Sequence, residues 1–467
     1  MMTPTKFAVL GSSPISNSVV VHSDIRLLSL DCPWTSSSSS YKHAVRDPRR
    51  RKVQKERTFD DGTTIVMSCS CTMSTTCSSA ESLAGRLFGP GEEGENWWDD
   101  KCLFYPVVVK EPSSAAAAAA ASSGSSTSSW RMYYYGRNQD SWHSGVKPAL
   151  LSTGRVGVAL SEDGFQWKRY RGTLPEGAIL DPDEASSSSS FDCVHVGCGD
   201  VFFFEGEWWM FYFGGSAETI EFGARGAGAG KALQGFRMLP GLIKSTDGFV
   251  FNRKHSPGSP LLQIGRKNEF DEVFIAWPRV IPPPCKELEG QSLPMNKEHW
   301  LMTYSSIQQT SPPVSAIGAA TSSDGLQWTK AGCVLARGAK GTWDDGGVGR
   351  RHVLFLDGQY VMFYEGVDAN GIHGIGLAFS RDGIHWKKDT VLGTEPGGPI
   401  FRARIGEEEA WDNGTVAAPH VVQLDDSSFR LYYVGSNALK TQSAIGVALS
   451  DGTNFRSWVR PILSLPS

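Results

Sequence analysis

Acidic and basic side chains that could carry out chemistry occupy matched places in a repeated pattern along this chain of 467 residues. Two carboxyl groups facing one cavity can act as general acid and base, and a planar guanidinium group matches phosphate or carboxylate. The place directly before a Val varies in residue type among the repeats: it holds Val107, Asp200, Arg279, His352 and His420. Glu365 also departs from its repeat, because it ends an aromatic segment where other repeats carry an apolar or aromatic residue. The candidate catalytic residues are therefore Asp200, Asp271 and Glu365, and the candidate substrate-binding residues are Arg279, Arg350, His352, His420 and Trp277.

The repeat itself predicts the elements that position these residues. A phrase of the type Ser-x-Asp-Gly-x-x-aromatic begins at Ser161, Ser245, Ser322 and Ser380, with a looser copy at Ser450. Asp-Gly favours a tight turn, because Gly accepts a positive φ at no steric cost. A strand of small apolar residues precedes each turn, an aromatic strand precedes that one, a further strand lies upstream, and a last strand follows the turn. The sequence therefore predicts an all-β fold, a five-bladed β-propeller with four antiparallel strands per blade.

Some of the candidate residues also have structural interpretations. Asp271 belongs to a set that follows an aromatic residue in every repeat, and repeated residues usually serve the repeat. That set is Asp99 or Asp100, Asp192, Asp271, Asp344 and Asp412. Each His can instead bond between blades, and Arg279 and Arg350 can pair with a repeat Asp. Because strand side chains alternate between two faces, we expect either the set with Asp200 or the set with Arg350 to face the propeller axis, but not both.

The order of these phrases resembles the arabinanase/levansucrase/invertase superfamily of five-bladed propeller glycosidases, which includes proteins like glycosyl hydrolase families 43 and 32. The resemblance covers the chain from about Trp97 to its last residue. It implies catalytic carboxylates on the innermost strands, immediately before a Pro. The matching positions of this chain hold no acid: they are Tyr105, Cys198, Trp277, Arg350 and Ala418. The residues one position earlier are not acids either.

Two functions therefore stay open. The resemblance implies a carbohydrate-active hydrolase or transferase that uses acids at unusual positions, whereas the missing carboxylates favour an inactive propeller that binds a ligand or assembles with a protein partner. A hydrolase needs two carboxyl groups about 5 Å apart for retention or about 6.5–9.5 Å apart for inversion. The cationic groups near the axis suit a carbohydrate or an anionic small molecule in the central channel. Cys193, His195 and Cys198 have a ligand-like spacing without a second pair, so we expect no metal and no cofactor.

Residues 1–96 differ in kind from the rest. They are rich in Ser and Thr, contain few acidic residues up to Phe59, and carry a basic run from Arg46 to Arg57. This composition predicts a disordered N-terminal region with a transit peptide, and hence a location in the chloroplast stroma, although an ordinary tail has a similar composition. The propeller is expected to occupy residues 97–467.

Charge and hydropathy exclude two classes of partner. The formal net charge is −4 and no basic stripe with interleaved aromatic residues occurs in the repeats, so we expect no nucleic-acid partner. No stretch approaches the roughly 20 apolar residues needed to span a bilayer, so we expect no membrane span. The nine cysteines share no repeat position, which favours a reducing compartment over a disulfide framework.

Overall fold

The computed structural model describes most of the chain from residue 80 onward. The described ranges are 80–91, 97–111, 130–137, 154–183, 190–221, 234–253, 258–283, 299–310, 312–390, 398–424, 426–440 and 442–463, with the backbone alone of 53–58, 64–69 and 232–233. Most of residues 1–96, where disorder and a transit peptide are predicted, lie outside these ranges. Within them the only helical element is a single 3₁₀ turn, Pro175–Gly177, and no helix is long and apolar enough to cross a membrane.

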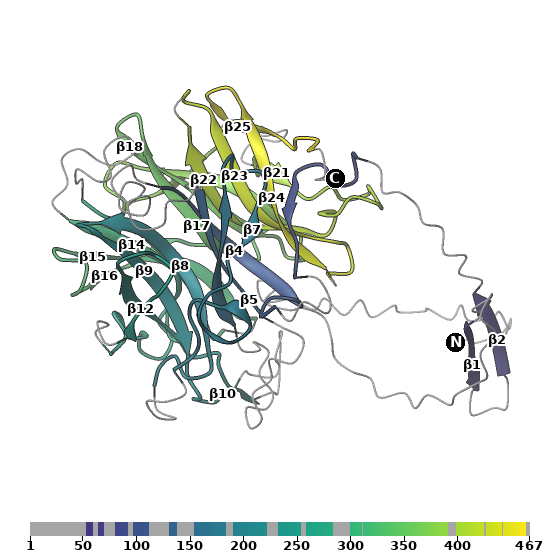
Figure 1. Cartoon of the computed structure of the whole chain (residues 1–467), viewed down its shortest axis with the longest axis horizontal. Helices are drawn as coiled ribbons and strands as arrows, with labels where there is room; N and C mark the ends of the chain where they lie inside the picture. Colours follow the sequence, from purple (N-terminus) through teal and green to yellow (C-terminus); the bar gives the residue numbers. More distant parts are fainter. Residues whose placement is uncertain are drawn as a thin grey trace, which may run out of the picture.

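The described strands form five consecutive antiparallel meanders (Figure 1). The first contains β4 (Cys102–Lys110), β5 (Trp130–Arg137), β6 (Arg155–Ser161) and β7 (Lys168–Arg169). The second contains β8 (His195–Phe204), β9 (Glu207–Gly215) and β12 (Met238–Ser245), with a small ribbon of β10 (Ile220–Glu221) and β11 (Ala232–Leu233) between the last two. The third contains β13 (Ala276–Ile281), β14 (Trp300–Gln308), β15 (Val314–Ser322) and β16 (Thr329–Leu335).

The last two meanders follow the same plan. The fourth contains β17 (Gly347–Leu356), β18 (Gln359–Val367), β19 (His373–Ser380) and β20 (Lys387–Lys388). The fifth contains β22 (Thr415–Gln423), β23 (Phe429–Ser436), β24 (Ser443–Asp451) and β25 (Asn454–Val459). Two short strands, β3 (Arg86–Phe88) and β21 (Phe401–Arg402), pair with β24 and β19 respectively. A separate pair is formed by β1 (Val53–Thr58) and β2 (Thr64–Cys69).

The first strands of the meanders build a ring. Each inner strand contacts the next one around the ring: β4 contacts β8, β8 contacts β13, β13 contacts β17, and β17 contacts β22. A contact between β22 and β4 closes the ring. These inner strands therefore surround a common hub, and the prediction of an all-β propeller is confirmed. The second meander departs from the predicted four strands: in the described part of the chain no fourth strand pairs with β12, although Asn252 N–H donates to Lys244 O (3.4 Å) and Leu261 N–H donates to Pro240 O (2.8 Å).

The repeated turn has the hydrogen bonds that its sequence predicts. In the first meander, the Ser161 hydroxyl accepts from Gly164 N–H (2.8 Å), and Asp163 Oδ1 accepts from Phe165 N–H (2.7 Å). The Trp167 indole N–H donates back to Gly164 O (3.1 Å). Gly164 has a φ of +77°, which explains why the turn requires glycine.

The aromatic–Asp pairs form a second repeated unit. In the first meander the Tyr134 hydroxyl donates to Asp99 (3.1 Å), and Arg169 pairs with the same carboxylate (2.9 Å). The other repeat carboxylates have an equivalent tyrosine and cation: Asp192 with Tyr212 and Arg253, Asp271 with Tyr304 and Lys330, Asp344 with Tyr364 and Lys388, and Asp412 with Tyr433 and Arg460. Each unit ties three strand segments of one meander together, which is a structural task.

Candidate functional site

Every inner strand has a register irregularity at its centre, and these irregularities shape the hub. They fall between Phe104 and Val107, Cys198 and Asp200, Ala276 and Arg279, Val348 and Arg351, and Ala417 and His420. Three of them contain a non-glycine residue with a positive φ, followed by Pro: Tyr105 (+59°), Trp277 (+51°) and Ala418 (+50°). Such backbone is uncommon for bulky residues and concentrates at functional sites.

The bulges interrupt strand alternation at the positions of both candidate sets, and residues of the two sets touch each other. The Arg279 guanidinium lies 4.5 Å from the centre of the Tyr105 ring, so a residue from each set is in contact with the other. A bulge re-aims side chains because its extra residue interrupts strand alternation. The expectation that only one set faces the axis assumed an unbroken period of two along the inner strands, which these strands do not have.

The first hub layer consists of Asp200, Arg279, His352 and His420, and we call it the inter-blade belt. Asp200 on β8 accepts from Val280 N–H on β13 (2.8 Å). Arg279 on β13 donates to Arg351 O on β17 and to Pro106 O on β4, both at 3.2 Å. These bonds join one inner strand to another across the hub.

The two histidines complete the inter-blade belt. The Val421 N–H of β22 donates to His352 Nδ1 on β17 (3.2 Å), and His420 Nε2 donates to Val108 O on β4 (2.8 Å). Their ring centres lie 4.1 Å apart. Burial lowers the pKa of both rings well below the usual value, so both are neutral. The alternative of an inter-blade hydrogen bond therefore describes both histidines.

The second hub layer surrounds Glu365, which is fully buried near the end of β18. Its carboxylate accepts from Arg350 Nε (2.8 Å) and Nη2 (2.9 Å), from His373 Nδ1 (2.8 Å) and from Ala418 N–H (3.1 Å). Burial acts to raise the pKa of Glu365, but Arg350, His373 and the Ala418 amide outweigh it and lower the pKa to about 2. Glu365 is therefore ionised, and its donors occupy both oxygens.

Two aromatic residues of the hub have unused polar atoms. Tyr105 is fully buried and Trp277 is 5% exposed. The Tyr105 hydroxyl and the Trp277 indole N–H have no hydrogen-bond partner among the residues that the structure describes. The Arg350 guanidinium lies 5.6 Å from the Trp277 ring centre. We call Tyr105, Trp277 and Arg350 the donor cluster.

Asp271 lies apart from both layers. It belongs to the repeated structural unit, where it accepts from Tyr304 (3.2 Å) and pairs with Lys330 (2.6 Å). Sequence reasoning did not select two hub residues, His373 and Arg351. Arg351 is fully buried and donates to Ser305 Oγ (2.8 Å) and Trp277 O (2.6 Å), which fixes the bulge of β13. The recurrent x-Pro pairs were the available signal for the bulges.

Comparisons with known proteins agree with this fold. No protein-family model matches the chain, and no curated protein matches it. A solved structure described as a glycoside hydrolase matches with 17% identity and a TM-score of 0.52, over 82% of this chain and 94% of that one. A structure from Parabacteroides distasonis, also assigned to the glycoside hydrolases, matches with 13% identity and a TM-score of 0.50, over 81% and 96%. A thermostable family-43 glycoside hydrolase matches with 15% identity and a TM-score of 0.44, over 75% and 91%. The first two likenesses show the fold: the chain has a propeller fold like that of solved structures described as glycoside hydrolases.

Proposed function

We propose that this protein binds an anionic carbohydrate in the hub of its propeller and does not hydrolyse it. The fold supports a carbohydrate ligand, because the structures it resembles include glycoside hydrolases. The observation that carries the proposal is the state of the hub carboxylates. Those of Glu365 and Asp200 are already bound by side chains and backbone amides, whereas the donor cluster has unused hydrogen-bond donors.

The three candidate catalytic carboxylates do not form an acid–base pair. A general acid must hold a proton near neutral pH, but Glu365 stays ionised down to about pH 2. Asp200 has a pKa raised by burial, yet it accepts from Val280 N–H (2.8 Å) and Val201 N–H (3.1 Å) and pairs with Arg279. Asp271 is held in its repeat unit. Hydrolysis would require at least two of these groups to be free.

The donor cluster favours an anionic ligand. A ligand that accepts from Tyr105 Oη–H and Trp277 Nε1–H has to present acceptor oxygens, and carboxylate or phosphate groups present several. The Arg350 guanidinium, which binds Glu365 through Nε and Nη2, adds positive charge to the hub. The nearby acceptors of Glu365 are occupied. The hub also contains three guanidinium groups, on Arg279, Arg350 and Arg351, against the two carboxylates of Asp200 and Glu365. The positive excess attracts a uronic acid or a sugar phosphate.

A binding experiment tests the proposal. Thermal shift and calorimetry with matched neutral sugars, sugar acids and sugar phosphates should show stabilisation by the acidic sugars and no release of product. Tyr105→Phe removes only the unpartnered hydroxyl, so it should leave the fold as stable as before and weaken binding about tenfold or more, since a hydrogen bond to a charged group contributes about 1.5–3 kcal/mol. Tyr360→Phe, a tyrosine outside the hub, is the control and should bind normally.

The outcomes separate the alternatives. Hydrolysis of any sugar by the wild-type protein would overturn the inactive part of the proposal. Binding that is unaffected by Tyr105→Phe would show that the ligand binds somewhere other than the donor cluster. A complete absence of sugar binding would favour a protein-assembly role.

We also propose that the protein works in the plastid stroma. The support is the Ser/Thr-rich, basic composition of the first 59 residues. Residues 1–80 fused to a fluorescent protein should direct it into plastids of plant cells and be shortened there, as fluorescence microscopy and immunoblotting would show. Fluorescence that stays in the cytosol at full length would argue for an ordinary tail.

A further inference from the structure

The segment from Glu81 to Gly89, which precedes the predicted start of the propeller, is part of its fifth meander; we call it the strap. Its strand β3 pairs with β24, Phe88 opposite Ile445 and Arg86 opposite Gly446. Next to this pairing, Val447 N–H donates to Gly85 O and Gly85 N–H donates to Pro461 O, each at 2.7 Å. The strap thus lies against the fifth meander and is bonded to its third strand and to the segment after its fourth.

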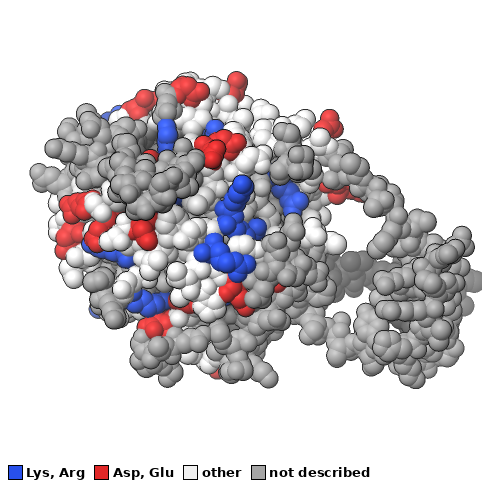
Figure 2. Space-filling model, viewed as in Figure 1, with Lys and Arg blue, Asp and Glu red and all other residues white. Residues whose placement is uncertain are grey.

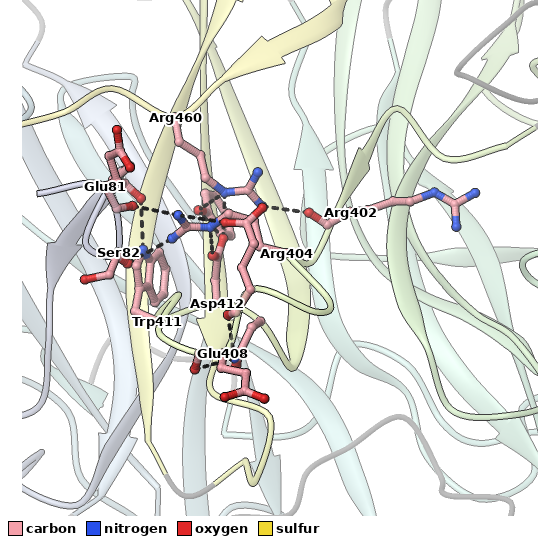
Figure 3. Close-up of polar contacts among 12 residues, drawn as sticks. Glu81, Ser82, Arg402, Arg404, Glu408, Trp411, Asp412 and Arg460 are labelled. Carbon is pink, nitrogen blue, oxygen red and sulfur yellow. Dashed lines mark hydrogen bonds and ion pairs between the residues drawn. The ribbon is translucent and has the colours of Figure 1, made fainter. Parts of the chain in front are cut away.

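Side chains of the fifth meander hold the other part of the strap (Figure 3). Arg404 donates to Glu81 O (2.7 Å) and Ser82 O (3.0 Å). Trp411 donates through its backbone N–H to Ser82 O (3.2 Å) and through its indole N–H to Ala84 O (3.0 Å). The carbonyls of Glu81, Ser82 and Ala84 therefore all have donors on the same short segment of chain.

Asp412 organises this contact. In the other meanders the repeat Asp pairs with one cation among the described residues, but Asp412 pairs with both Arg460 and Arg404, each at 2.7 Å. Asp412 is fully buried, so the two guanidinium groups offset its charge. Because Arg404 binds Asp412 through Nε, its two terminal nitrogens are directed at the strap.

The strap also bonds to the first meander, so it spans the seam between the two ends of the ring. The Phe88 ring packs edge-on against Tyr134 with ring centres 5.2 Å apart, and Arg169 stacks 4.2 Å from the Phe88 ring centre. Arg169 also donates to Gly89 O. The strap has the same place before β4 that β21 has before β22: β21 pairs with β19 of the preceding meander as β3 pairs with β24.

We infer that the strap closes the ring, and that proteolytic maturation of the N-terminus takes place upstream of Glu81. A cut inside the strap would remove the donors and acceptors that join the fifth meander to the first. The statement about maturation rests on the proposed transit peptide, whereas the closure of the ring does not. Both are independent of the sugar-binding proposal, because they involve neither hub layer.

Replacing Gly85 by alanine in the full chain tests the inference, because the substitution should displace the strap. Gly85 has a φ of +75°, and a Cβ there would lie 2.6 Å from Val447 O, so the added methyl group has to displace either the strap or β24. Gly206 has a similar φ of +84° and nothing within 4 Å of a Cβ, so Gly206→Ala reproduces the backbone strain without the clash. Relative to Gly206→Ala, we expect Gly85→Ala to be cut by trypsin after Arg86 about tenfold faster or more, because cleavage follows the population of the open strap.

Two measurements decide the inference. Hydrogen exchange should show loss of protection at Val447 N–H in Gly85→Ala and retention in Gly206→Ala. N-terminal sequencing of the processed protein from cells should give a first residue at or before Glu81. Equal trypsin rates in the two variants, or a natural N-terminus beyond Phe88, would overturn it.

Discussion

Glu365 carries a negative charge in the interior of the propeller, and its partners determine what it can do. An isolated buried carboxylate would take up a proton, because transfer of the charge from water is costly. Arg350 binds both of its oxygens, and His373 and Ala418 each add one donor. The same bonds that keep the group ionised occupy both of its oxygens, and they join β17, β18, β19 and β22 to one another.

The variant Glu365→Gln tests this role. The amide leaves the Arg350 guanidinium buried without its counter-charge, so we expect a loss of about 3–5 kcal/mol in the free energy of unfolding. Denaturant titration measures it. Glu207→Gln, which breaks a half-exposed pair with Lys244 (3.6 Å), is the control and should cost less than about 1 kcal/mol. A stable Glu365→Gln protein with lost enzymatic turnover would instead assign Glu365 to catalysis.

At the scale of elements, the sequence predicted what depends on local chemistry. The Asp-Gly turns, the aromatic strands and the order of strands within each meander follow from residues that are neighbours along the chain. The repeated aromatic–Asp pairs were also visible, and the preferred structural interpretation of this set agrees with the tyrosine and cation that each carboxylate binds. Asp271, chosen as a candidate catalytic residue, belongs to that set.

The sequence predicted that each histidine could bond between blades, but the partners of bonds between residues far apart in the chain could not be predicted from it. The inter-blade belt joins side chains to backbone atoms of other strands, as in the bond from His420 to Val108 O across 312 positions. The positive φ of Trp277 is fixed partly by Arg351, which donates to its carbonyl oxygen. The strap escaped prediction because β3 is three residues long and carries no copy of the repeated phrase. The predicted start of the propeller at residue 97 therefore omits its closing strand.

At the scale of the whole molecule, the surface carries charged side chains, whereas the histidines of the interior are neutral. Figure 2 shows basic and acidic side chains interspersed on the face in view. Four histidines of the interior are instead neutral; His195, His373 and His420 are buried and His352 is half-buried. Desolvation lowers the pKa of His195 to about 4, and lowers the pKa of His352, His373 and His420. In mildly acidic solution the folded protein therefore binds fewer protons than the unfolded chain.

This difference predicts that acid destabilises the protein from about pH 6.5 downward. Above that pH the histidines are neutral in both states and contribute nothing. Below it the unfolded chain binds protons that the folded ring does not, so the free energy of unfolding falls by up to about 1.4 kcal/mol per pH unit for each such histidine. Below about pH 4.5 Glu365 adds to the loss, because its folded pKa of about 2 lies under its unfolded value.

Denaturant titrations between pH 7.5 and pH 5 measure this slope, and one histidine can be removed from it. His195 Nε2 donates to Gly235 O (2.6 Å), a bond that the side-chain amide in His195→Gln can also donate without titrating. The variant should therefore lose about 1.4 kcal/mol per pH unit of the wild-type dependence near pH 5, whatever its stability at pH 7.5. An unchanged slope in the variant would show that the histidine is already protonated in the fold. If the free energy of unfolding of the wild-type protein stayed constant from pH 7.5 to pH 5, all four histidines would already be protonated in the folded state. The hub would then have to accommodate the added positive charge.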